Sequence, residues 1–231
     1  MLQDWNTLPD FMRLPEVRPY YDALQQKRFQ LLLKQIFDYV AAVFLFIILA
    51  IPMVILAIWI KLDSEGPVFY RQERVTTYGK RFRIHKFRTM VNNADKIGSA
   101  VTVSGDLRIT KVGKKLRDLR LDELPQIFDV LQGNMSFVGT RPEAIKYVER
   151  YKPEYYATLL LSAGITSEAS IRYKDEARLL DAAEDVDKVY IEQVLPAKMQ
   201  WNLRTIKQFS FMEDIATMFR TVFAVLGKEY M

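Results

Sequence analysis

Two adjacent carboxylates, Asp122 and Glu123, lie in the stretch LRLDELPQ of a chain that is otherwise basic. The chain has 231 residues, a net charge of +5 and no cysteine. Arg117 and Arg120 precede the acids, and Arg141 follows them. Acids at a helix start often serve only as caps, because they accept hydrogen bonds from free amide groups. Capping does not explain the surrounding arginines, which together with a helix N-terminus favour a phosphate site.

Two carboxylates repel a phosphate unless a divalent cation lies between the charges. Mg²⁺ binds through one or two carboxylates together with phosphate oxygens of a substrate. We therefore expect Mg²⁺ as the cofactor, bound by Glu123 and Asp122. A carboxylate that is not occupied by metal can attack phosphorus as a nucleophile. The pair predicts phosphoryl transfer from an anionic donor.

The elements that position this pair follow from the hydrophobic pattern. Residues 67–90 alternate like a β-hairpin around a Tyr-Gly-Lys turn. On its second strand, Lys86 and Arg88 share the face of the apolar residues. Such cations either bind an anion or lie at the rim of a sheet with their charged ends in water. His85 falls on the opposite, polar face, and we assign it no role.

Two helices are predicted around the acids. Apolar residues between 109 and 119 recur at spacings of three, four and three, which is typical of an amphipathic helix. A short helix follows, with Asp122 as its N-cap, Pro125 in its first turn and Gly133 as its stop. A loop and a short strand come next. The acidic group further on is expected to be a solvated surface, at Asp181, Glu184, Asp185 and Asp187.

An apolar segment from Tyr39 to Ile60 contains no charged residue and is long enough to match the hydrocarbon core of a bilayer. Both of its flanks are cationic, and cationic flanks are retained in the cytoplasm. Pro52 lies near its middle and is expected to bend it. We predict a membrane helix over 34–60 that is broken at Pro52 and re-enters the leaflet from which it came. A kinked full span and a buried helix of a soluble protein are the alternatives.

Near the C-terminus, an apolar stripe runs along residues 211–226 with cations beside it. The stripe is either ordinary core or a helix in the membrane interface. We expect amphipathic helices over 196–231. The predicted fold is a small α/β membrane-associated domain with a proline-broken re-entrant helix and interfacial amphipathic helices.

Five motifs occur in a fixed order: GPVFYRQERV, FRIHKFRTM, DLRITKVGKKLR, LDELPQIFDVLQGNMSFVGTRPE and AGIT. With the preceding apolar helix and its central proline, they resemble the bacterial sugar transferases, or monotopic phosphoglycosyl transferases. The resemblance is close over roughly residues 34–170. It implies one phosphoglycosyl transferase domain over 1–231, without an N-terminal regulatory domain.

The resemblance also implies a reaction. A UDP-sugar gives its phosphosugar to polyprenyl (undecaprenyl) phosphate, and UMP leaves. Asp122 matches the nucleophile, which forms a covalent aspartyl-phosphosugar intermediate, and Glu123 matches the acid that helps to hold Mg²⁺. Four further positions match the basic residues of the family motifs and are expected to bind substrate: Lys86, Arg88, Arg117 and Arg141.

Two departures from the family pattern lie at positions where the chain is expected to bend: the loop before Arg141 and the membrane helix at Pro52. Thr140 stands where many members have proline, which removes a rigid residue beside Arg141. Ile51 stands where a serine often precedes the proline of the membrane helix, so the expected bend depends on Pro52 and packing. We expect the protein at the cytoplasmic face of the bacterial inner membrane, at the start of surface polysaccharide or glycoprotein glycan assembly.

Two other interpretations are compatible with parts of the sequence. In the first, the chain is a non-enzymatic, membrane-anchored basic module that binds anionic lipid or nucleic acid. Against that module, the cations cluster around acids in short motifs instead of forming one exposed stripe. A third interpretation keeps the enzyme but makes the transfer direct. The enzyme interpretation excludes nucleic acid as a partner, and the sequence leaves open the sugar, the polyprenol length and the oligomeric state, a homo-oligomer included.

Overall fold

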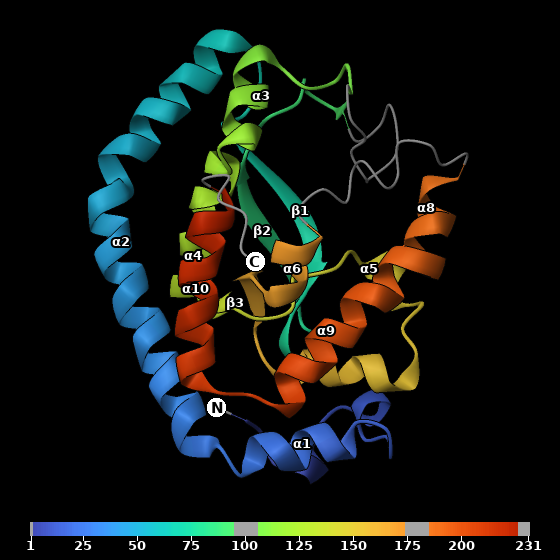
Figure 1. Ribbon diagram of the computed structural model, residues 1–231. Helices are drawn as coiled ribbons and strands as arrows, with labels where there is room; N and C mark the ends of the chain where they lie inside the picture. The colour runs from blue at the N-terminus through green and yellow to red at the C-terminus, as the bar shows by residue number, and fades with distance from the viewer. Residues whose placement is uncertain (1, 95–105, 174–184, 226–231) are drawn as a thin grey trace.

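The computed structural model describes residues 2–94, 106–173 and 185–225. One long helix, α2 (Arg28–Asp63), runs along one side of the molecule and curves around the remaining elements (Figure 1). It is the one helix in the described ranges that is long and apolar enough to cross a membrane. Only 11% of its most apolar window is buried, which argues against the core helix of a soluble protein. The alternative of a buried soluble helix is thus not supported.

The apolar helix predicted over 34–60 is confirmed as a helix, and it is longer than predicted, because it begins at Arg28 and ends at Asp63. Its length and exposed apolar surface are compatible with membrane association. The first turns continue the helix since Leu31 is buried against the N-terminal part of the chain. Pro52 lies inside the helix without a change of secondary structure, so the predicted break there is not observed. A proline removes one backbone donor, and a gently curved helix tolerates that loss. Re-entry into the same leaflet stays a prediction.

The predicted hairpin is confirmed. Strand β1 (Phe69–Val75) pairs antiparallel with β2 (Arg81–Phe87), and the turn between them is the short 3₁₀ helix η3 (Thr77–Gly79). Tyr78 and Gly79 both have positive φ, 57° and 78°. A tight hairpin turn requires such left-handed residues, which glycine adopts without strain.

A second sheet consists of β3 (Met135–Val138) and β4 (Ala163–Thr166), which are parallel. At its end the two backbones approach closely, and a Cβ atom on Gly164 would lie 2.1 Å from the amide nitrogen of Gly139. Glycine is therefore required there, and the chain after β3 is held firmly against β4.

Short helices fill the space between the sheets, α2 and the N-terminal segment (Figure 1). Three of them build the site: α3 (Lys111–Asp118), the 3₁₀ helix η5 (Leu121–Gln126) and α4 (Ile127–Leu131). The predicted helix over 109–119 and the stop at Gly133, where φ is +71°, are confirmed. The others are α1 (Arg18–Gln25), α5 (Ile145–Val148), α6 (Glu168–Arg172), α8 (Val186–Val189), α9 (Leu195–Lys207), α10 (Phe211–Val225), the 3₁₀ helices η1 (Trp5–Thr7), η2 (Asp10–Met12) and η6 (Pro153–Leu160), and the π-helix η7 (Tyr190–Val194).

Three hydrophobic clusters hold these elements. The largest joins the N-terminal segment, η6 and α9. The second packs Ala42 of α2 against both sheets, and the third packs Met53 and Ile60 of α2 against β2 and α3. Helix α2 therefore buries one stripe against the domain, while apolar residues such as Ile47 and Ile51 point outward and are 69% and 73% exposed.

The two C-terminal helices lie within the range 196–231 predicted as amphipathic helices, but they differ in burial. Helix α9 buries Met199, Leu203 and Ile206 in the largest cluster, so it is a core helix. Helix α10 buries Asp214 and Thr217 but exposes Phe219 by 63%. The apolar stripe on α10 is thus not ordinary core, and residues 226–231 lie outside the described ranges.

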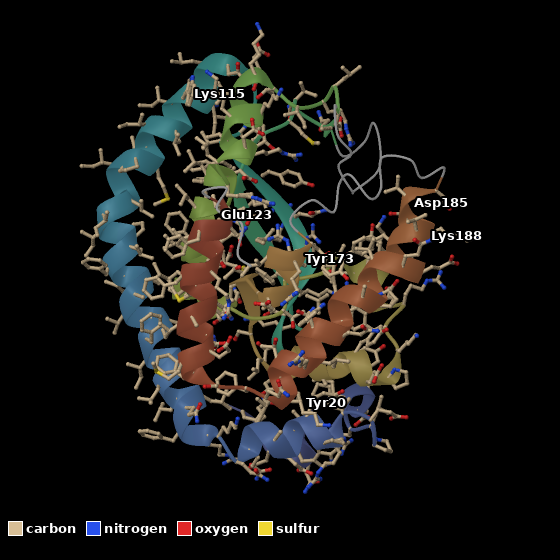
Figure 2. The ribbon with its side chains drawn as sticks, in the orientation of Figure 1. Tyr20, Lys115, Glu123, Tyr173, Asp185 and Lys188 are labelled. Carbon is tan, nitrogen blue, oxygen red and sulfur yellow. The ribbon has the colours of Figure 1, made fainter. Side chains whose placement is uncertain are left out.

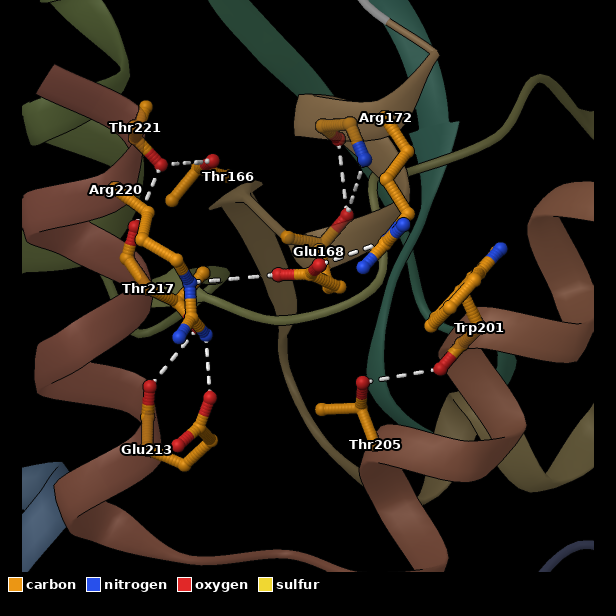
Figure 3. Close-up of polar contacts among 11 residues, drawn as sticks. Thr166, Glu168, Arg172, Trp201, Thr205, Glu213, Thr217, Arg220 and Thr221 are labelled. Carbon is orange, nitrogen blue, oxygen red and sulfur yellow. Dashed lines mark hydrogen bonds and ion pairs between the residues drawn. The ribbon is translucent and has the colours of Figure 1, made fainter. Parts of the chain in front are cut away.

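Polar contacts attach α10 to the sheet that carries β4 (Figure 3). Thr221 shares a hydrogen bond of 2.7 Å with Thr166, the last residue of β4. Arg220 forms an ion pair with Glu168 at 3.5 Å, and Glu168 also accepts a hydrogen bond from Arg172. These polar side chains face the protein together with Met218, whereas Phe219 and Val222 are exposed on the other side of α10.

The predicted acidic surface is described only in part. Asp181 and Glu184 lie outside the described residues. Asp185 caps α8, and its carboxylate accepts a hydrogen bond from the backbone of Lys188. Asp187 pairs with Lys146 and accepts a hydrogen bond from Tyr147. These two acids have structural partners at a half-open surface.

Candidate active site

Asp122 and Glu123 lie inside η5, directly after a left-handed turn at Arg120, where φ is +56°. The predicted N-cap at Asp122 is wrong, because η5 begins one residue earlier and Arg120 occupies the cap position without a side-chain hydrogen bond. Arg120 is also not on the preceding helix, which ends at Asp118. The turn lets the acids enter the interior, where Asp122 is 8% exposed. Figure 2 shows Glu123 in the inner part of the molecule.

Glu123 is held by two of the predicted cations. Lys86 donates a hydrogen bond of 2.8 Å to its Oε1, and Arg141 binds both of its carboxylate oxygens. Burial by itself would raise the pKa of Glu123, but Arg141 and Lys86 outweigh it and hold that pKa well below its ordinary value. Burial also lowers the pKa of Lys86, and the charge of Glu123 opposes this change. Glu123 is therefore an anion that holds two cations in place.

Asp122 has a different environment. Within the described ranges no hydrogen bond reaches its carboxylate, and it lines a cavity of about 290 Å³. Burial and the adjacent charge of Glu123 raise its pKa above the ordinary value, while Lys86 and Arg117 act against that change. Two neighbouring acids with pKa values moved in opposite directions generally have separate tasks. Asp122 is the acid that faces a substrate-sized space.

Arg117 reaches the same cavity from α3. Its Nε donates a hydrogen bond of 2.8 Å to Thr89, just beyond β2. Gly113 makes this arrangement possible, because a Cβ atom there would lie 2.0 Å from the carbonyl oxygen of Thr89. Burial lowers the pKa of Arg117, and the charge of Asp122 opposes that change. The structure thus brings Lys86, Arg117 and Arg141 to the acid pair.

Arg88 is not brought to the acids. Its guanidinium donates hydrogen bonds to the backbone carbonyl oxygens of Ser64 and Glu65, directly after α2. It is 5% exposed and forms part of the cavity wall. Lys86 lies on β2 as predicted, but the strand ends at Phe87. Arg88 therefore lies beyond the strand and does not follow its alternation. Substrate binding by Arg88 stays a prediction, and its observed contacts stabilise the end of the membrane helix.

The loop that carries Arg141 is well fixed although Thr140 replaces the proline of the family pattern. The amide of Gly139 donates to the carbonyl of Thr166 at 3.0 Å, and the amide of Gly164 donates to the carbonyl of Thr140 at 2.9 Å. Lys34 of α2 donates to the carbonyl of Val138 at 2.8 Å. Strand pairing and a lysine of the membrane helix thus perform the task of the missing proline.

His85 was missed by the analysis of the sequence. Its ring Nδ1 lies 2.8 Å from a carboxylate oxygen of Asp129, and its backbone amide donates to the other oxygen at 2.8 Å. Asp129 is fully buried, and His85 lies beside the rings of Phe69 and Phe128. The expected position on a polar face is wrong, because the side chain of His85 is 12% exposed and pairs with a buried acid. No local signal reveals the pairing, because 44 residues separate the partners.

Asp122 and Glu123 are few ligands for Mg²⁺, but carboxylates are the type of ligand that it binds. Within the described ranges no group of three or more acidic, histidine or cysteine side chains could hold a metal ion. Mg²⁺ requires only one or two carboxylates when substrate phosphates complete its shell. Asp122 is available, whereas Glu123 must release one of its ion pairs to take part. Gln126, one 3₁₀ turn after Glu123, has a buried amide without a hydrogen-bond partner among the described residues.

Comparison with known proteins adds independent information. The family model described as bacterial sugar transferase matches residues 29–228. A UDP-N-acetylgalactosamine-undecaprenyl-phosphate N-acetylgalactosaminephosphotransferase from Aeromonas hydrophila is 36% identical over 197 residues, which are 84% of this chain and 44% of the relative. A UDP-glucose:undecaprenyl-phosphate glucose-1-phosphate transferase from Escherichia coli (strain K12) is 36% identical over 197 residues, 83% of this chain and 40% of the relative.

A shorter relative is covered more completely. The UDP-glucose:undecaprenyl-phosphate glucose-1-phosphate transferase from Caulobacter vibrioides is 36% identical over 196 residues, which are 84% of this chain and 69% of that protein. The chain spans less than half the length of the Aeromonas and Escherichia proteins. The family match over residues 29–228 includes the acid pair and the elements that position it.

Proposed function

The chain belongs to the bacterial sugar transferase family, and from this premise we propose that it transfers a sugar 1-phosphate from a UDP-sugar to undecaprenyl phosphate and releases UMP. The names of the relatives specify a UDP-sugar and undecaprenyl phosphate for those proteins. The observation that carries the proposal here is the separation of the two acids. Glu123 is an ion-paired anion, and Asp122 faces a cavity that Lys86 and Arg117 also line.

Asp122 acts as the nucleophile in this proposal. Its carboxylate oxygen attacks the phosphorus that bears the sugar, and the bond from that phosphorus to the bridging oxygen breaks. UMP leaves with the bonding electron pair, and an aspartyl-phosphosugar acyl phosphate, a mixed anhydride, remains. A phosphate oxygen of undecaprenyl phosphate then attacks the same phosphorus and releases the Asp122 carboxylate. Carboxylates serve as phosphoryl acceptors in other enzymes. Both steps occur at the same phosphorus, so the sugar and its phosphate are transferred together to the lipid.

The cations have the task of stabilising negative charge. Charge grows on the phosphoryl oxygens and on the leaving phosphate, and pre-positioned cations in a site that excludes water lower the barrier. Lys86 and Arg117 line the cavity beside Asp122, and Arg141 is oriented by Glu123. Glu123 thus holds two cations close to the reacting atoms, and its charge opposes the lowering of the pKa of Lys86 by burial.

Mg²⁺ belongs to the proposal as the cofactor, with Asp122 and Glu123 as its carboxylate ligands. When bound, it would neutralise charge on the pyrophosphate. The test uses Mn²⁺ as a spin probe and measures its binding by electron paramagnetic resonance in the presence of UMP. Glu123→Gln should weaken Mn²⁺ binding, while Glu149→Gln, a change at an exposed position of the same charge type, should leave it unaltered. Equal Mn²⁺ affinity in wild type and Glu123→Gln would exclude Glu123 as a ligand.

Membrane placement is part of the proposal. The outward residues of α2 and those of α10, among them Ile51 and Phe219, are apolar and exposed. Lipid would cover both sets, with α2 inserted and α10 lying in the interface. We place the site at the cytoplasmic face of the inner membrane, where UDP-sugars are made. Trp59 near the end of α2 stacks beneath the ammonium of Lys115, at 5.4 Å, as an aromatic residue at a membrane boundary would.

The direct test incubates the purified chain with undecaprenyl phosphate, Mg²⁺ and a panel of UDP-sugars. The products are analysed for nucleotide and for lipid-linked sugar. UMP and undecaprenyl diphosphate sugar should form with at least one donor. Release of UDP would indicate a glycosyl transferase that leaves both phosphates on the nucleotide, and the proposal would then be wrong.

A further inference from the structure

Three aromatic residues line the cavity beside Asp122: Phe69, Tyr70 and Phe87. The rings of Phe69 and Phe87 stack on each other with centroids 5.6 Å apart, whereas Tyr70 lies on the opposite face of β1 from Phe69. Tyr70 lies on β1 directly opposite Lys86 on β2, so the two side chains share one face of the hairpin. Tyr70 is 38% exposed and lines the cavity together with Asp122. Tyr70 is therefore the cross-strand neighbour of Lys86, the residue that contacts Glu123.

The lining of the cavity is mixed in charge. Cations and acids surround Asp122, and residues 90–94 form a part of the wall with uncharged side chains, including Asn92 and Asn93, beside Arg88 and Arg108. This wall is held by Arg108, whose guanidinium donates to the carbonyl of Ala94 at 2.9 Å. The amide of Val91 in turn donates to the carbonyl of Arg108 at 2.8 Å. The uncharged side chains of residues 90–94, with their two amide groups, suit a neutral part of a substrate, and Arg88 and Arg108 beside them suit its anionic part.

A nucleoside diphosphate sugar has a matching division of charge. Its pyrophosphate is anionic, and the nucleoside beyond it is neutral and carries a flat aromatic base. Aromatic side chains bind such bases by stacking. We infer that Tyr70 is the stacking platform for the nucleobase of the donor, with the wall of residues 90–94 beside the nucleoside. This inference rests on the proposed function, because it assumes a nucleotide-linked donor.

The sugar of the donor is the rival occupant, since a pyranose ring can also lie against an aromatic ring. UMP distinguishes the two, because it contains the base, the ribose and one phosphate but no transferred sugar. If Tyr70 contacts the base, its loss weakens UMP itself. If Tyr70 contacts the sugar, its loss changes the KM for the UDP-sugar and leaves UMP affinity unaltered.

The experiment measures the Kd of UMP by calorimetry with the full chain in detergent. Tyr70→Ala should raise the Kd roughly 5- to 150-fold, which is the range measured when a stacking aromatic is removed. Tyr70→Phe keeps the ring and should bind UMP within roughly a factor of three of the wild type. Tyr70→Leu keeps apolar bulk without a ring and should lose nearly as much affinity as Tyr70→Ala.

Tyr20→Ala is the matched control, because Tyr20 lies on α1 at the far end of the molecule from Glu123 (Figure 2). It should leave the Kd of UMP unaltered. Wild-type affinity in Tyr70→Leu would show that bulk suffices and would overturn the inference, as would unaltered UMP binding in Tyr70→Ala. The proposed function is tested separately, since a wild-type chain that releases no UMP from any UDP-sugar contradicts that function whatever Tyr70 does.

Discussion

The contact between Lys86 and Glu123 can be perturbed from both sides, which makes it the most quantitative test of the site. The two charged groups are 2.8 Å apart, and their side chains are 21% and 11% exposed. At an effective dielectric constant near 20, two charges about 4 Å apart attract by about 4 kcal/mol, and desolvation offsets part of that. We therefore expect a coupling free energy of about 2 kcal/mol in the double-mutant cycle.

The cycle consists of Lys86→Met, Glu123→Gln and the double variant. Lys86→Met should lower the free energy of unfolding by about 2 kcal/mol, because it leaves the buried Glu123 with Arg141 alone. For a chain of this size that corresponds to roughly 4–8 °C in the thermal midpoint, measured by circular dichroism at one fixed scan rate. The double variant should be about 2 kcal/mol more stable than the sum of the single effects predicts.

Lys80→Met is the matched control. Lys80 precedes the same strand, and its Nζ donates to Asn134 at 3.0 Å in an exposed contact. Its removal should cost less than about 1 kcal/mol, because exposed contacts of this kind contribute little. Additive single effects, within about 0.5 kcal/mol, would show that Lys86 and Glu123 do not interact in solution. The pairing of cation and acid at the site would then need revision.

The pH dependence of the cycle has a defined sign. The pKa of Glu123 in the folded protein is held well below its ordinary value of 4.5 by Arg141 and Lys86. The stabilisation from its charge is therefore fully present above pH 4.5 and is lost as the pH falls through the lowered, folded-state pKa. The coupling should persist unchanged at pH 5. A coupling that has already disappeared at pH 5 would contradict the depressed pKa of Glu123.

Three further outcomes are expected. Asp122→Asn should abolish turnover and raise the thermal midpoint at pH 7. The pKa of Asp122 is raised in the folded protein, so its charge destabilises the folded state once the pH exceeds the ordinary value of 3.8. An unchanged or lowered midpoint would contradict this expectation. Gly113→Ala should reduce kcat at least roughly tenfold, because the added methyl group displaces α3 from the Thr89 carbonyl. Gly133→Asn, at an exposed left-handed turn, is the control and should be tolerated. Wild-type activity in Gly113→Ala would argue against the close approach. Single cysteines in place of Gln26 and Glu65, both exposed and flanking α2, should resist an impermeant thiol reagent in intact spheroplasts and react after lysis; labelling at position 26 from outside would show a full span.

The sequence predicted those helices and strands whose apolar residues recur with the period of the element itself. The alternation of β1 and β2 gave the hairpin, and the three-four-three spacing gave α3, because in both cases one buried face dictates the pattern. The acid pair and its neighbours Lys86, Arg117 and Arg141 were also identified, from the concentration of charge. These features depend on residues close together in the chain or on long motifs.

Features that depend on distant partners could not be predicted. His85 finds Asp129 across 44 residues, and Arg88 turns to the end of α2 because the strand stops at Phe87. Helix α9 has an amphipathic sequence that suits either an interface or a core, and the N-terminal segment decides in favour of the core. The left-handed turn at Arg120 gives no signal, since arginine rarely adopts that conformation.

The central claim is that Asp122 forms a covalent bond to the phosphosugar, and intact-protein mass spectrometry tests it most directly. The wild-type chain is mixed with a UDP-sugar that supports turnover and with Mg²⁺, but without undecaprenyl phosphate. Its mass should increase by one sugar phosphate, with one UMP released per chain, and adding undecaprenyl phosphate should remove the adduct. Asp122→Asn should show no adduct, whereas Asp118→Asn, at the end of α3, should behave as the wild type. An adduct on Asp122→Asn, or wild-type turnover by that variant, would contradict the assignment of the nucleophile.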